Sequence, residues 1–597
     1  MSDLRLKRTI SSALWAAYAD ALGFPTELAS DKTVQRRLGH STITRTESWK
    51  RLVGGRFGAT VSLPAGAYSD DTQLRLATSR AIRGNGYFDV ESFAKIELTV
   101  WQAYALGAGR GSKAAAAALC NRSNNWFSNF FPNYENGGGN GAAMRVQPHV
   151  WAASNLADKA SYIPDVIRNA LCTHGHMRGI AGAVVHAVSL AHAFETGKPI
   201  NPDQWHTLAN DIRAIPKMIA SDNELMTFWV PTWTRKSGQS LEDAIEIVAC
   251  EWEDASRSTA SLLLSSSTLD YSATYEEVVK QQNGLSTEER GSGLKCALFA
   301  NVAAWISPKA GAQESIQIVA NLLDSDTDTI GTMAGALIGA AYPEASYLGP
   351  VQDHIYIRDE AERLYHVSQG KNTYSFSYPD LLYWQPPRTM IDILGLKDNR
   401  LQIGGLGDVN PLEAPFHGQK GASWQWFLLS TGQTILSRFR TDLLTKAQPR
   451  KEVISEKLDT PDLFDQAMES RDRTISRNAG AHAANNKALD IHAQQSNIER
   501  TPEKTPSPSM QARKLENIAE HQTTSATSSV SPDNQDRRSI DLDELTNEAI
   551  RGFDPQTIGR HILLIAEQPN AIELSIAYSA VVVKARTARL KHKLRNA

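Results

Sequence analysis

The sequence predicts an all-α fold for about the first 345 residues, and three observations support this prediction. Apolar residues recur at helical spacing in residues 10–17 and again in residues 180–191. Segments of alternating polarity, which would indicate strands, are hard to find in this region. All thirteen tryptophans lie before residue 430, so the front of the chain can bury a large core. We therefore expect a compact multi-helix domain over residues 1–345.

Residues 346–445 differ in composition from the segment before them. Residues 354–357 and 373–378 are aromatic and β-branched, and glycine turn signals follow at Gly404-Gly405 and Gly407-Asp408. This pattern predicts a small mixed α/β or β-containing appendage of unknown role.

The remainder of the chain divides into a linker and a C-terminal module. Residues 446–539 contain one aromatic residue and are rich in Ser, Thr, Asn, Gln and charge, which predicts a disordered linker. Residues 540–597 regain helical periodicity and should form a small helical module. Its last helix is basic, which is typical of a solvated face, although docking of a protein partner or of nucleic acid is the alternative.

Charge and cysteine content exclude several classes of protein. The net charge of −3 gives no general indication of a nucleic-acid or membrane partner. The four cysteines form no close pair, which argues against a disulfide framework or a structural zinc site and favours the reducing cytoplasm. They are Cys120, Cys172, Cys250 and Cys296. No segment reaches 18 uninterrupted apolar residues, so no membrane span is expected.

The first segment that could carry chemistry is residues 20–27. A helix that starts near Lys7 should end at Gly23-Phe24-Pro25, because glycine and then proline stop a helix. Glu27 would then lie on the loop just past the helix end, where a carboxylate can reach a substrate. Taken alone, Glu27 is more typical of an ordinary surface glutamate.

The second segment places a hydroxyl and two carboxylates, Ser69, Asp70 and Asp71, at the start of a helix that continues to Ile82. Hard cations such as Mg²⁺ or Mn²⁺ prefer oxygen ligands of this kind. Ordinary N-capping of the helix is the alternative explanation.

The third segment, residues 324–331, also opens a helix with hydroxyls and carboxylates. The predicted helix, Thr329–Ala341, is lined with glycine and alanine, so a neighbouring helix can approach closely. Two such helix starts in one domain are harder to explain by capping alone. If the fold brings them together, their aspartates would repel one another strongly unless cations neutralise them. The pair therefore predicts a binuclear metal site.

Five ordered motifs give the chain a specific resemblance to the ADP-ribosylglycohydrolase family, of the dinitrogenase reductase-activating type. The motifs span residues 8–345 and are Asp20 to Glu27, Ser69 to Thr72, Gly139-Asn140-Gly141-Ala142-Ala143-Met144-Arg145, Thr173-His174, and Asp326-Thr327-Asp328-Thr329. Residues beyond 345 have no counterpart in the minimal family core.

The resemblance implies a role for each matching residue. One metal ion would be held by Ser69, Asp70 and Asp71, and the second by Asp326, Asp328 and Thr329, with Asp328 bridging. Glu27 would lie near the scissile bond, and Glu27, Asp71 and Asp328 would form the catalytic group. The substrate-binding residues would be Asn140, Gly141 and Ala142 along the diphosphate and His174 near the ribose or phosphates.

Three positions depart from the family pattern. Ala19 stands where the family usually has glycine, Ser69 replaces the commoner threonine, and Asp324-Ser325 replaces a usual Gly-Gly. Because none of these changes removes an implied ligand, the chain is expected to be active.

The resemblance therefore implies a hydrolase that uses two Mg²⁺ or Mn²⁺ ions to cleave an ADP-ribosyl linkage from a modified protein. An arginine-type linkage is the first expectation, although the sequence itself does not distinguish linkages. Two alternatives remain open. One is a scaffold protein that binds ADP-ribose or a nucleotide without cleaving it, and the other is a hydrolase of a different N- or O-glycosidic nucleotide.

Overall fold

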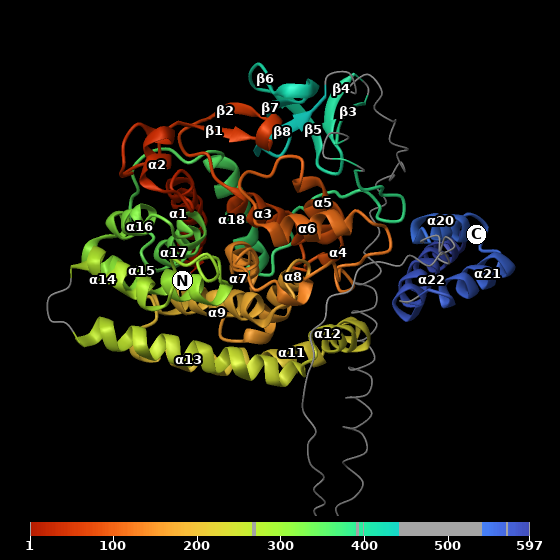
Figure 1. Cartoon of the computed structure of the whole chain (residues 1–597), viewed down its shortest axis with the longest axis horizontal. Helices are drawn as coiled ribbons and strands as arrows, with labels where there is room; N and C mark the ends of the chain where they lie inside the picture. Colours follow the sequence, from red (N-terminus) through yellow and green to blue (C-terminus); the bar gives the residue numbers. More distant parts are fainter. Residues whose placement is uncertain are drawn as a thin grey trace, which may run out of the picture. The chain divides into compact units, whose positions relative to one another are not determined.

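A computed structural model describes residues 2–265, 270–387, 389, 393–397, 399–440, 540–568 and 571–595. These residues belong to one compact unit, which comprises Met1–Pro449 and Ile540–Ala597. The linker predicted over residues 446–539 lies outside the described residues. The unit is mainly helical, and this confirms the predicted fold class (Figure 1).

Eighteen α-helices of the described chain precede the second sheet. They are α1 (Ser2–Gly23), α2 (Asp31–Leu38), α3 (Asp70–Ala81), α4 (Val90–Ser92), α5 (Leu98–Trp101), α6 (Arg110–Leu119), α7 (Gln147–Ala152), α8 (Ile163–Leu171), α9 (Met177–Thr196), α10 (Ala209–Arg213), α11 (Ile215–Ala220), α12 (Val230–Ser237), α13 (Leu241–Ser265), α14 (Tyr271–Gln281), α15 (Gly293–Ala310), α16 (Ala312–Asn321), α17 (Thr327–Ala341) and α18 (His354–Ser368). Helix α9 is long and apolar enough to cross a membrane by length and composition, but 89% of its apolar window is buried, as in the core helix of a globular protein.

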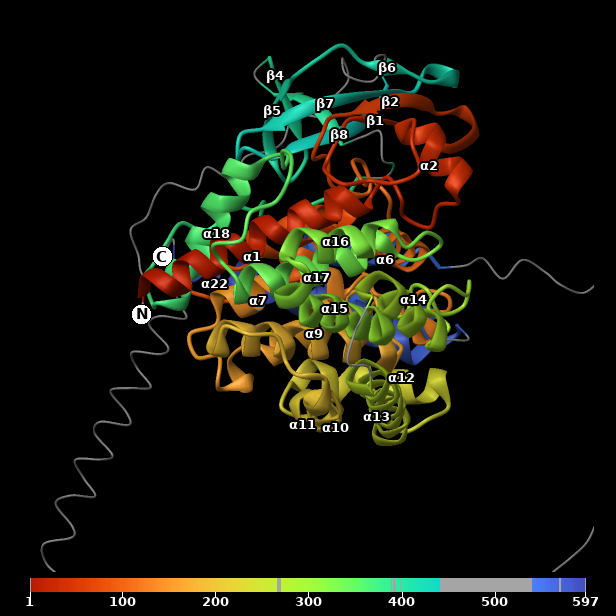
Figure 2. The same ribbon diagram turned by 90° about the vertical axis from the view of Figure 1, so that its left-hand side faces the viewer.

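The centre of the helical body is the close pairing of α1 with α17, which lie side by side in Figures 1 and 2. A Cβ on Gly335 would lie 2.4 Å from the carbonyl oxygen of Trp15, and one on Gly339 would lie 2.4 Å from that of Ser11. Only glycine permits two helix backbones to approach this closely. The small residues of the helix therefore allow the close approach that the sequence predicted.

A two-stranded hairpin corrects the expectation that strands are absent from the first 345 residues. Strand β1 (Trp49–Val53) pairs antiparallel with β2 (Ala59–Leu63), and Trp49 lies opposite Leu63. In β2 the apolar side chains of Ala59, Val61 and Leu63 are buried while the intervening ones are exposed. The alternation was present in the sequence, but strands this short give a weak signal.

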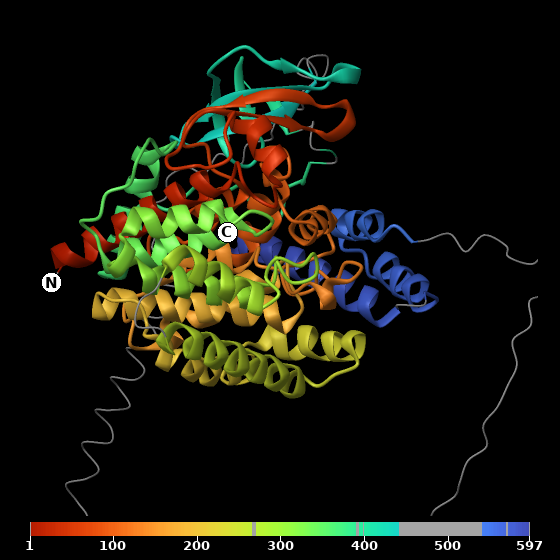
Figure 3. The ribbon, with the colours of Figure 1, turned by 60° about the vertical axis from the view of Figure 1, so that its left-hand side comes forward.

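A second sheet follows α18 and lies beside the hairpin on one side of the helices (Figure 3). Its strands are β3 (Leu394–Lys397), β4 (Arg400–Ile403), β5 (Gly407–Pro411), β6 (Phe416–His417), β7 (Ser423–Leu429) and β8 (Thr434–Phe439). They pair antiparallel in the order β3-β4-β5-β7. Strand β5 pairs with residues 427–429 of β7, β6 pairs with residues 423–424, and β8 pairs with residues 423–428. Residues 354–357, whose aromatic and β-branched composition suggested a strand, instead begin α18, because Ile357, Ala361 and Leu364 form a buried helical face.

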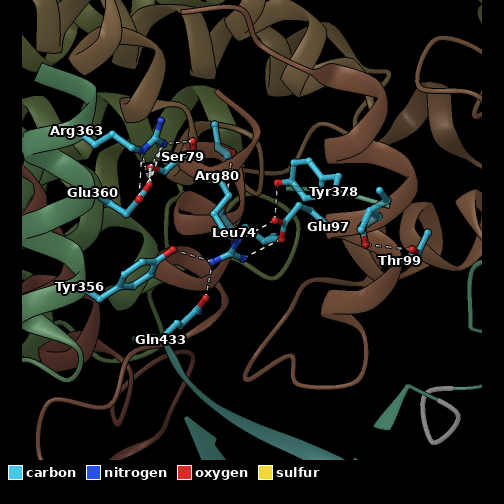
Figure 4. Close-up of polar contacts among 12 residues, drawn as sticks. Leu74, Ser79, Arg80, Glu97, Thr99, Tyr356, Glu360, Arg363, Tyr378 and Gln433 are labelled. Carbon is cyan, nitrogen blue, oxygen red and sulfur yellow. Dashed lines mark hydrogen bonds and ion pairs between the residues drawn. The ribbon is translucent and has the colours of Figure 1, made fainter. Parts of the chain in front are cut away.

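A buried polar network connects α3 with α18 and the second sheet (Figure 4). Arg80 on α3 forms a two-pronged ion pair with Glu97, at 2.7 and 2.8 Å, and donates to Gln433 between β7 and β8 at 2.6 Å. Tyr378 also donates to Glu97, at 2.7 Å. The side chains of Arg80 and Glu97 are 2% and 0% exposed, so neither charge could remain there without its partner.

The C-terminal residues form three helices: α20 (Leu542–Gly552), α21 (Pro555–Ala566) and α22 (Ala571–Arg595). Their small core includes Leu542, Phe553, Ile565 and Tyr578. Inside it, the His561 ring is 2.8 Å from the Tyr578 hydroxyl, which satisfies the buried imidazole.

Candidate metal and substrate site

The candidate site begins with Asp20, which holds the start of α3 in place. Its buried carboxylate accepts hydrogen bonds from the backbone N–H groups of Ser69 (2.8 Å) and Thr72 (2.9 Å) and from the Thr72 hydroxyl. Arg75 donates to the same Thr72 hydroxyl at 2.7 Å. The first turn of α3 is thus capped by a side chain from the end of α1, which fixes the backbone that carries the following aspartates.

The start of α3 carries the first acidic pair. Ser69 Oγ caps the helix by accepting from the Asp71 N–H and also donates to Asp71 Oδ2 at 3.0 Å. Asp70 Oδ1 accepts from the Ala108 N–H at 2.6 Å, next to Gly107, whose φ of +93° favours glycine. The capping predicted as the alternative explanation is therefore present, and it positions both carboxylates.

The start of α17 carries the second acidic group. Oxygen atoms of Asp326, Asp328 and Glu27 all lie within 4.8 Å of one another. Asn140 donates its side-chain amide to Asp326 Oδ2 at 2.9 Å. The Thr329 hydroxyl lies 3.4 Å from Asp71 Oδ2, and this contact brings the two helix starts together as the metal-site prediction requires.

Glu27 is the most accessible carboxylate of this three-residue cluster, with 19% of its side chain exposed. Its Oε2 lies 3.7 Å from Nη1 of Arg51, which comes from strand β1. The Arg51 guanidinium also lies 4.5 Å from the ring centre of Phe24 and packs against Trp49. Glu27 is therefore a tethered residue at the edge of the site and not a freely solvated surface glutamate.

The carboxylates of the site raise one another's pKa values. Burial raises the pKa of Asp70 to about 7, with the charges of Glu27 and Asp20 adding to the effect. Burial also raises the pKa values of Asp71, Asp328 and Glu27, and neighbouring carboxylates raise them further. A site built in this way favours a bound cation, because a positive charge removes the cost of several buried negative charges.

The residues present fit a hard divalent cation. Asp71 Oδ1 is buried and has no hydrogen-bond partner among the described residues, although buried carboxylate oxygens are normally satisfied. The surrounding donors are carboxylate and hydroxyl oxygens, with no thiolate or imidazole among the predicted ligands. The acidic cluster can therefore hold a divalent metal ion.

The predicted substrate-binding residues lie beside this cluster. The Asn140 N–H donates to the Gly291 carbonyl at 3.0 Å, so it is already engaged, and the Asn140 side chain orients Asp326. A Cβ on Gly141 would lie 2.8 Å from Ser112 Oγ and 3.1 Å from the ring of His174, so this position needs a residue without a side chain. Ala142 is fully buried.

His174 lies deep in the protein beside this turn. Its Nδ1 is 2.7 Å from the Thr173 hydroxyl, and burial lowers its pKa to about 3, so the ring is neutral. Arg145 ties the whole turn together by donating to the Gly141 carbonyl at 2.8 Å and to the Thr173 hydroxyl at 2.8 Å. His174 therefore packs against the Gly139–Gly141 turn.

Several contributions to the site were missed in the sequence. The contacts of Asp20, Ala108 and Arg51 join segments that are 24 to 52 residues apart and have no local signal. For Ala108 alone, the flanking glycines Gly107 and Gly109 were a usable signal, because a left-handed turn often brings backbone N–H groups to an anion.

The family departures are accommodated. The Cβ of Ala19 lies over Gly331 and Gly335 of α17, where there is no opposing side chain. Asp324 adopts φ +64°, a conformation that glycine favours and that aspartate tolerates better than most residues.

Comparison with known proteins identifies several similar to this chain. The chain is 25% identical over 357 residues to the uncharacterized protein YegU of Escherichia coli (strain K12). The aligned region covers 57% of this chain and 89% of YegU. The chain is also 26% identical over 170 residues to the ADP-ribosyl-[dinitrogen reductase] glycohydrolase of Rhodospirillum rubrum. That aligned region covers 28% of this chain and 52% of the Rhodospirillum rubrum protein. A solved structure titled ADP-ribosylglycohydrolase-related protein complex matches with 19% identity and a TM-score of 0.38, over 61% of this chain and 99% of the other.

The family itself follows from a longer match. A family model described as ADP-ribosylglycohydrolase matches residues 1–373, which extends past the predicted boundary at 345 to include α18. The matched region contains every residue of the acidic site described above. The chain therefore belongs to the ADP-ribosylglycohydrolase family and is a glycosyl hydrolase that acts on ADP-ribose linkages.

Proposed function

We propose that this enzyme removes ADP-ribose from arginine side chains of modified proteins and that it requires two divalent cations, Mg²⁺ or Mn²⁺. The observation that supports the metal requirement most strongly is the meeting of two acidic helix starts, where Asp71 Oδ1 is buried without a hydrogen-bond partner among the residues that the structure describes. The arginine linkage and the protein substrate are proposed from the family and from the relative in Rhodospirillum rubrum. The four cysteines of the chain are free thiols, in keeping with the cytoplasmic location that we propose.

The predicted ligands divide between the two helix starts. Ser69, Asp70 and Asp71 would hold one ion, and Asp326, Asp328 and Thr329 would hold the other. Bound there, divalent cations would orient the ribose hydroxyls and neutralise the carboxylates. Asp20, Asn140 and the Ala108 N–H hold these ligands in position.

The reaction breaks the bond between the anomeric carbon of the ribose and the arginine nitrogen. The nitrogen leaves with the bonding electrons and takes up a proton, and water adds its oxygen to the anomeric carbon and loses a proton. Positive charge develops on the sugar in the transition state, as in other glycoside hydrolyses. In this proposal, negative charge of Asp71 and Asp328 that the cations leave uncompensated would stabilise the positive charge on the sugar. Glu27 is the most accessible of the three clustered carboxylates and lies beside Arg51. In this proposal it would accept a proton from the attacking water.

The test is release of ADP-ribose from an arginine-ADP-ribosylated protein, with Mg²⁺, with Mn²⁺ and with chelator. Metal-dependent release should disappear in Asp326→Ala and persist in Asp324→Ala, a neighbouring acid outside the proposed ligand set. Release that survives chelation would refute the metal requirement. Metal-dependent binding without release from arginine would refute the linkage and direct attention to serine or nucleic-acid linkages.

A further inference from the structure

An exposed basic face lies next to the candidate site. Residues 31–58, which comprise α2, the connection after it, strand β1 and the turn that leads to β2, contain seven lysines or arginines and two acidic residues. This segment, the basic rim, contrasts with a chain whose net charge is −3. Its exposed cations are Lys32, Arg36, Arg45, Lys50 and Arg56.

The chain does not neutralise most of this charge itself. Lys32, Arg36, Arg45 and Lys50 form no ion pair or hydrogen bond through their side chains with any residue in the part of the chain that the structure describes. One of the two acids of the rim, Glu47, is already engaged by His40 at 3.0 Å. A concentration of unpaired cations costs stability through repulsion, which a negatively charged partner would relieve.

Two inner arginines connect the basic rim with the site. Arg37 on α2 donates to the Pro25 carbonyl at 2.6 Å and packs against Trp49, and Arg51 on β1 lies beside Glu27. Both contacts fall on the loop between α1 and α2, which carries Glu27 to the edge of the site. Figure 2 shows α2 next to β1 and β2. A macromolecule whose modified side chain enters past Glu27 would therefore meet the basic rim.

The composition of the surface favours a protein over a nucleic acid. Two apolar side chains of the basic rim are exposed, Leu52 at 60% and Phe57 at 41%, and Leu28, on the loop that carries Glu27, is 39% exposed. Arginine mixed with apolar and aromatic side chains is typical of protein–protein interfaces, whereas nucleic-acid interfaces are more polar. Five of the seven cations of the basic rim are arginines.

We propose that the basic rim docks an acidic surface of the ADP-ribosylated protein, so that the enzyme selects modified arginines that lie among acidic residues. This inference rests on the proposed function and adds a substrate class to it. Docking here raises the rate of encounter and lowers KM, and it leaves the chemistry at the metal site unchanged.

The test uses three peptides of equal length, each with one ADP-ribosyl-arginine flanked by glutamate, serine or lysine, together with free ADP-ribosyl-arginine. For the wild type, kcat/KM should be about tenfold higher for the glutamate peptide than for the lysine peptide at low salt. The preference should shrink at high salt because exposed charges are screened. The rim variant Lys32→Glu/Arg36→Glu/Lys50→Glu should lose the preference for the glutamate peptide because its KM for that peptide rises. Its kcat and its cleavage of free ADP-ribosyl-arginine should stay unchanged.

A matched control reverses three exposed cations on helices far from α2 in sequence and on the opposite side of the body in Figure 2: Lys217→Glu/Lys236→Glu/Arg257→Glu. It should keep the preference. Equal kcat/KM for all three peptides in the wild type would overturn the proposal. The proposal would also be overturned if the rim variant lost cleavage of an ADP-ribosylated oligonucleotide and kept wild-type cleavage of all three peptides.

Binding separates this proposal from the proposed function. If the wild type cleaves none of the arginine substrates, the arginine linkage fails, and fluorescence anisotropy of the glutamate peptide still decides the docking. Salt-sensitive binding that only the rim variant loses would support the basic rim. Equal binding of the glutamate and lysine peptides would reject it.

Discussion

Replacement of Gly335 by alanine tests whether the packing of α1 on α17 positions the catalytic site. The new Cβ would lie 2.4 Å from the Trp15 carbonyl oxygen and 3.0 Å from the Cβ of Ala19. Neither neighbour is the end of a flexible side chain, so the two helices must separate. Gly335 lies two helical turns after Asp328, and Trp15 lies five residues before Asp20.

Two opposing contributions decide whether Gly335→Ala raises or lowers the free energy of unfolding. Alanine is favoured over glycine inside a helix by about 1 kcal/mol. Overpacking of a well-filled contact costs about 1–3 kcal/mol, and a backbone obstacle places this site at the upper end of that range. The net expectation is a loss of about 2 kcal/mol in the free energy of unfolding. Because an error of about 1 Å in catalytic geometry can reduce rates about 100-fold, kcat should fall further than stability alone would explain.

The assay compares Gly335→Ala with Gly111→Ala, a helical glycine of α6 whose Cβ would meet nothing within 4 Å. Thermal unfolding should show a lower Tm for the first variant and an unchanged or higher Tm for the second. Turnover is then measured well below both Tm values. A Gly335→Ala protein as stable and as active as Gly111→Ala would show that the close packing of α1 and α17 is unimportant.

Three further predictions follow from buried polar groups. Asp20→Asn removes the charge that holds the start of α3 and should weaken Mn²⁺ binding about 10- to 100-fold in calorimetric titration. A variant that binds Mn²⁺ as tightly as the wild type would contradict the positioning role of Asp20. Burial lowers the pKa of His186 to about 3, from 6.5 when exposed. The contribution of the neutral ring to stability is therefore complete above pH 6.5 and is lost as pH falls toward 3, by about 1.4 kcal/mol per pH unit. Between pH 6.5 and 5, the free energy of unfolding of His186→Asn, measured in urea, should therefore depend less steeply on pH than that of the wild type. Arg80→Met leaves the Glu97 carboxylate buried without its cation and should lower the free energy of unfolding by about 3–5 kcal/mol in chemical denaturation. The double variant Arg80→Met/Glu97→Leu should recover part of that loss, and an equal or larger loss in the double variant would refute the pairing argument.

The sequence predicted those parts of the fold and the site that depend on local signals. Glycine and proline after residue 22 predicted the end of α1, and small residues in 327–341 predicted the close neighbour of α17. The acidic starts of α3 and α17 were identified because hydroxyl and carboxylate groups at a helix start form a recognisable pattern. The hairpin was missed because its five-residue strands are too short to stand out.

What the sequence could not predict depends on contacts between distant segments. Nothing in the sequence indicated that the Asn140 side chain donates to Asp326, 186 residues away, or that its N–H donates to the Gly291 carbonyl. The pairing of Arg51 with Glu27 depends on the hairpin, which was itself missed. The six metal ligands and the catalytic roles remain predictions that the proposed assays address.

The second sheet belongs to the same packed body as the acidic site. Trp424 and Trp426 of β7 share a buried cluster with Phe24, Trp49 and strand β2, and Trp426 donates its indole N–H to the Ser62 carbonyl at 3.2 Å. The same hairpin carries Arg51 to Glu27. On the other side, the Arg80 network ties the sheet to α3. Residues beyond the family match, which ends at 373, therefore brace both the hairpin beside the site and the helix that begins with its aspartates. A variant without the sheet would be expected to lose the geometry of the site.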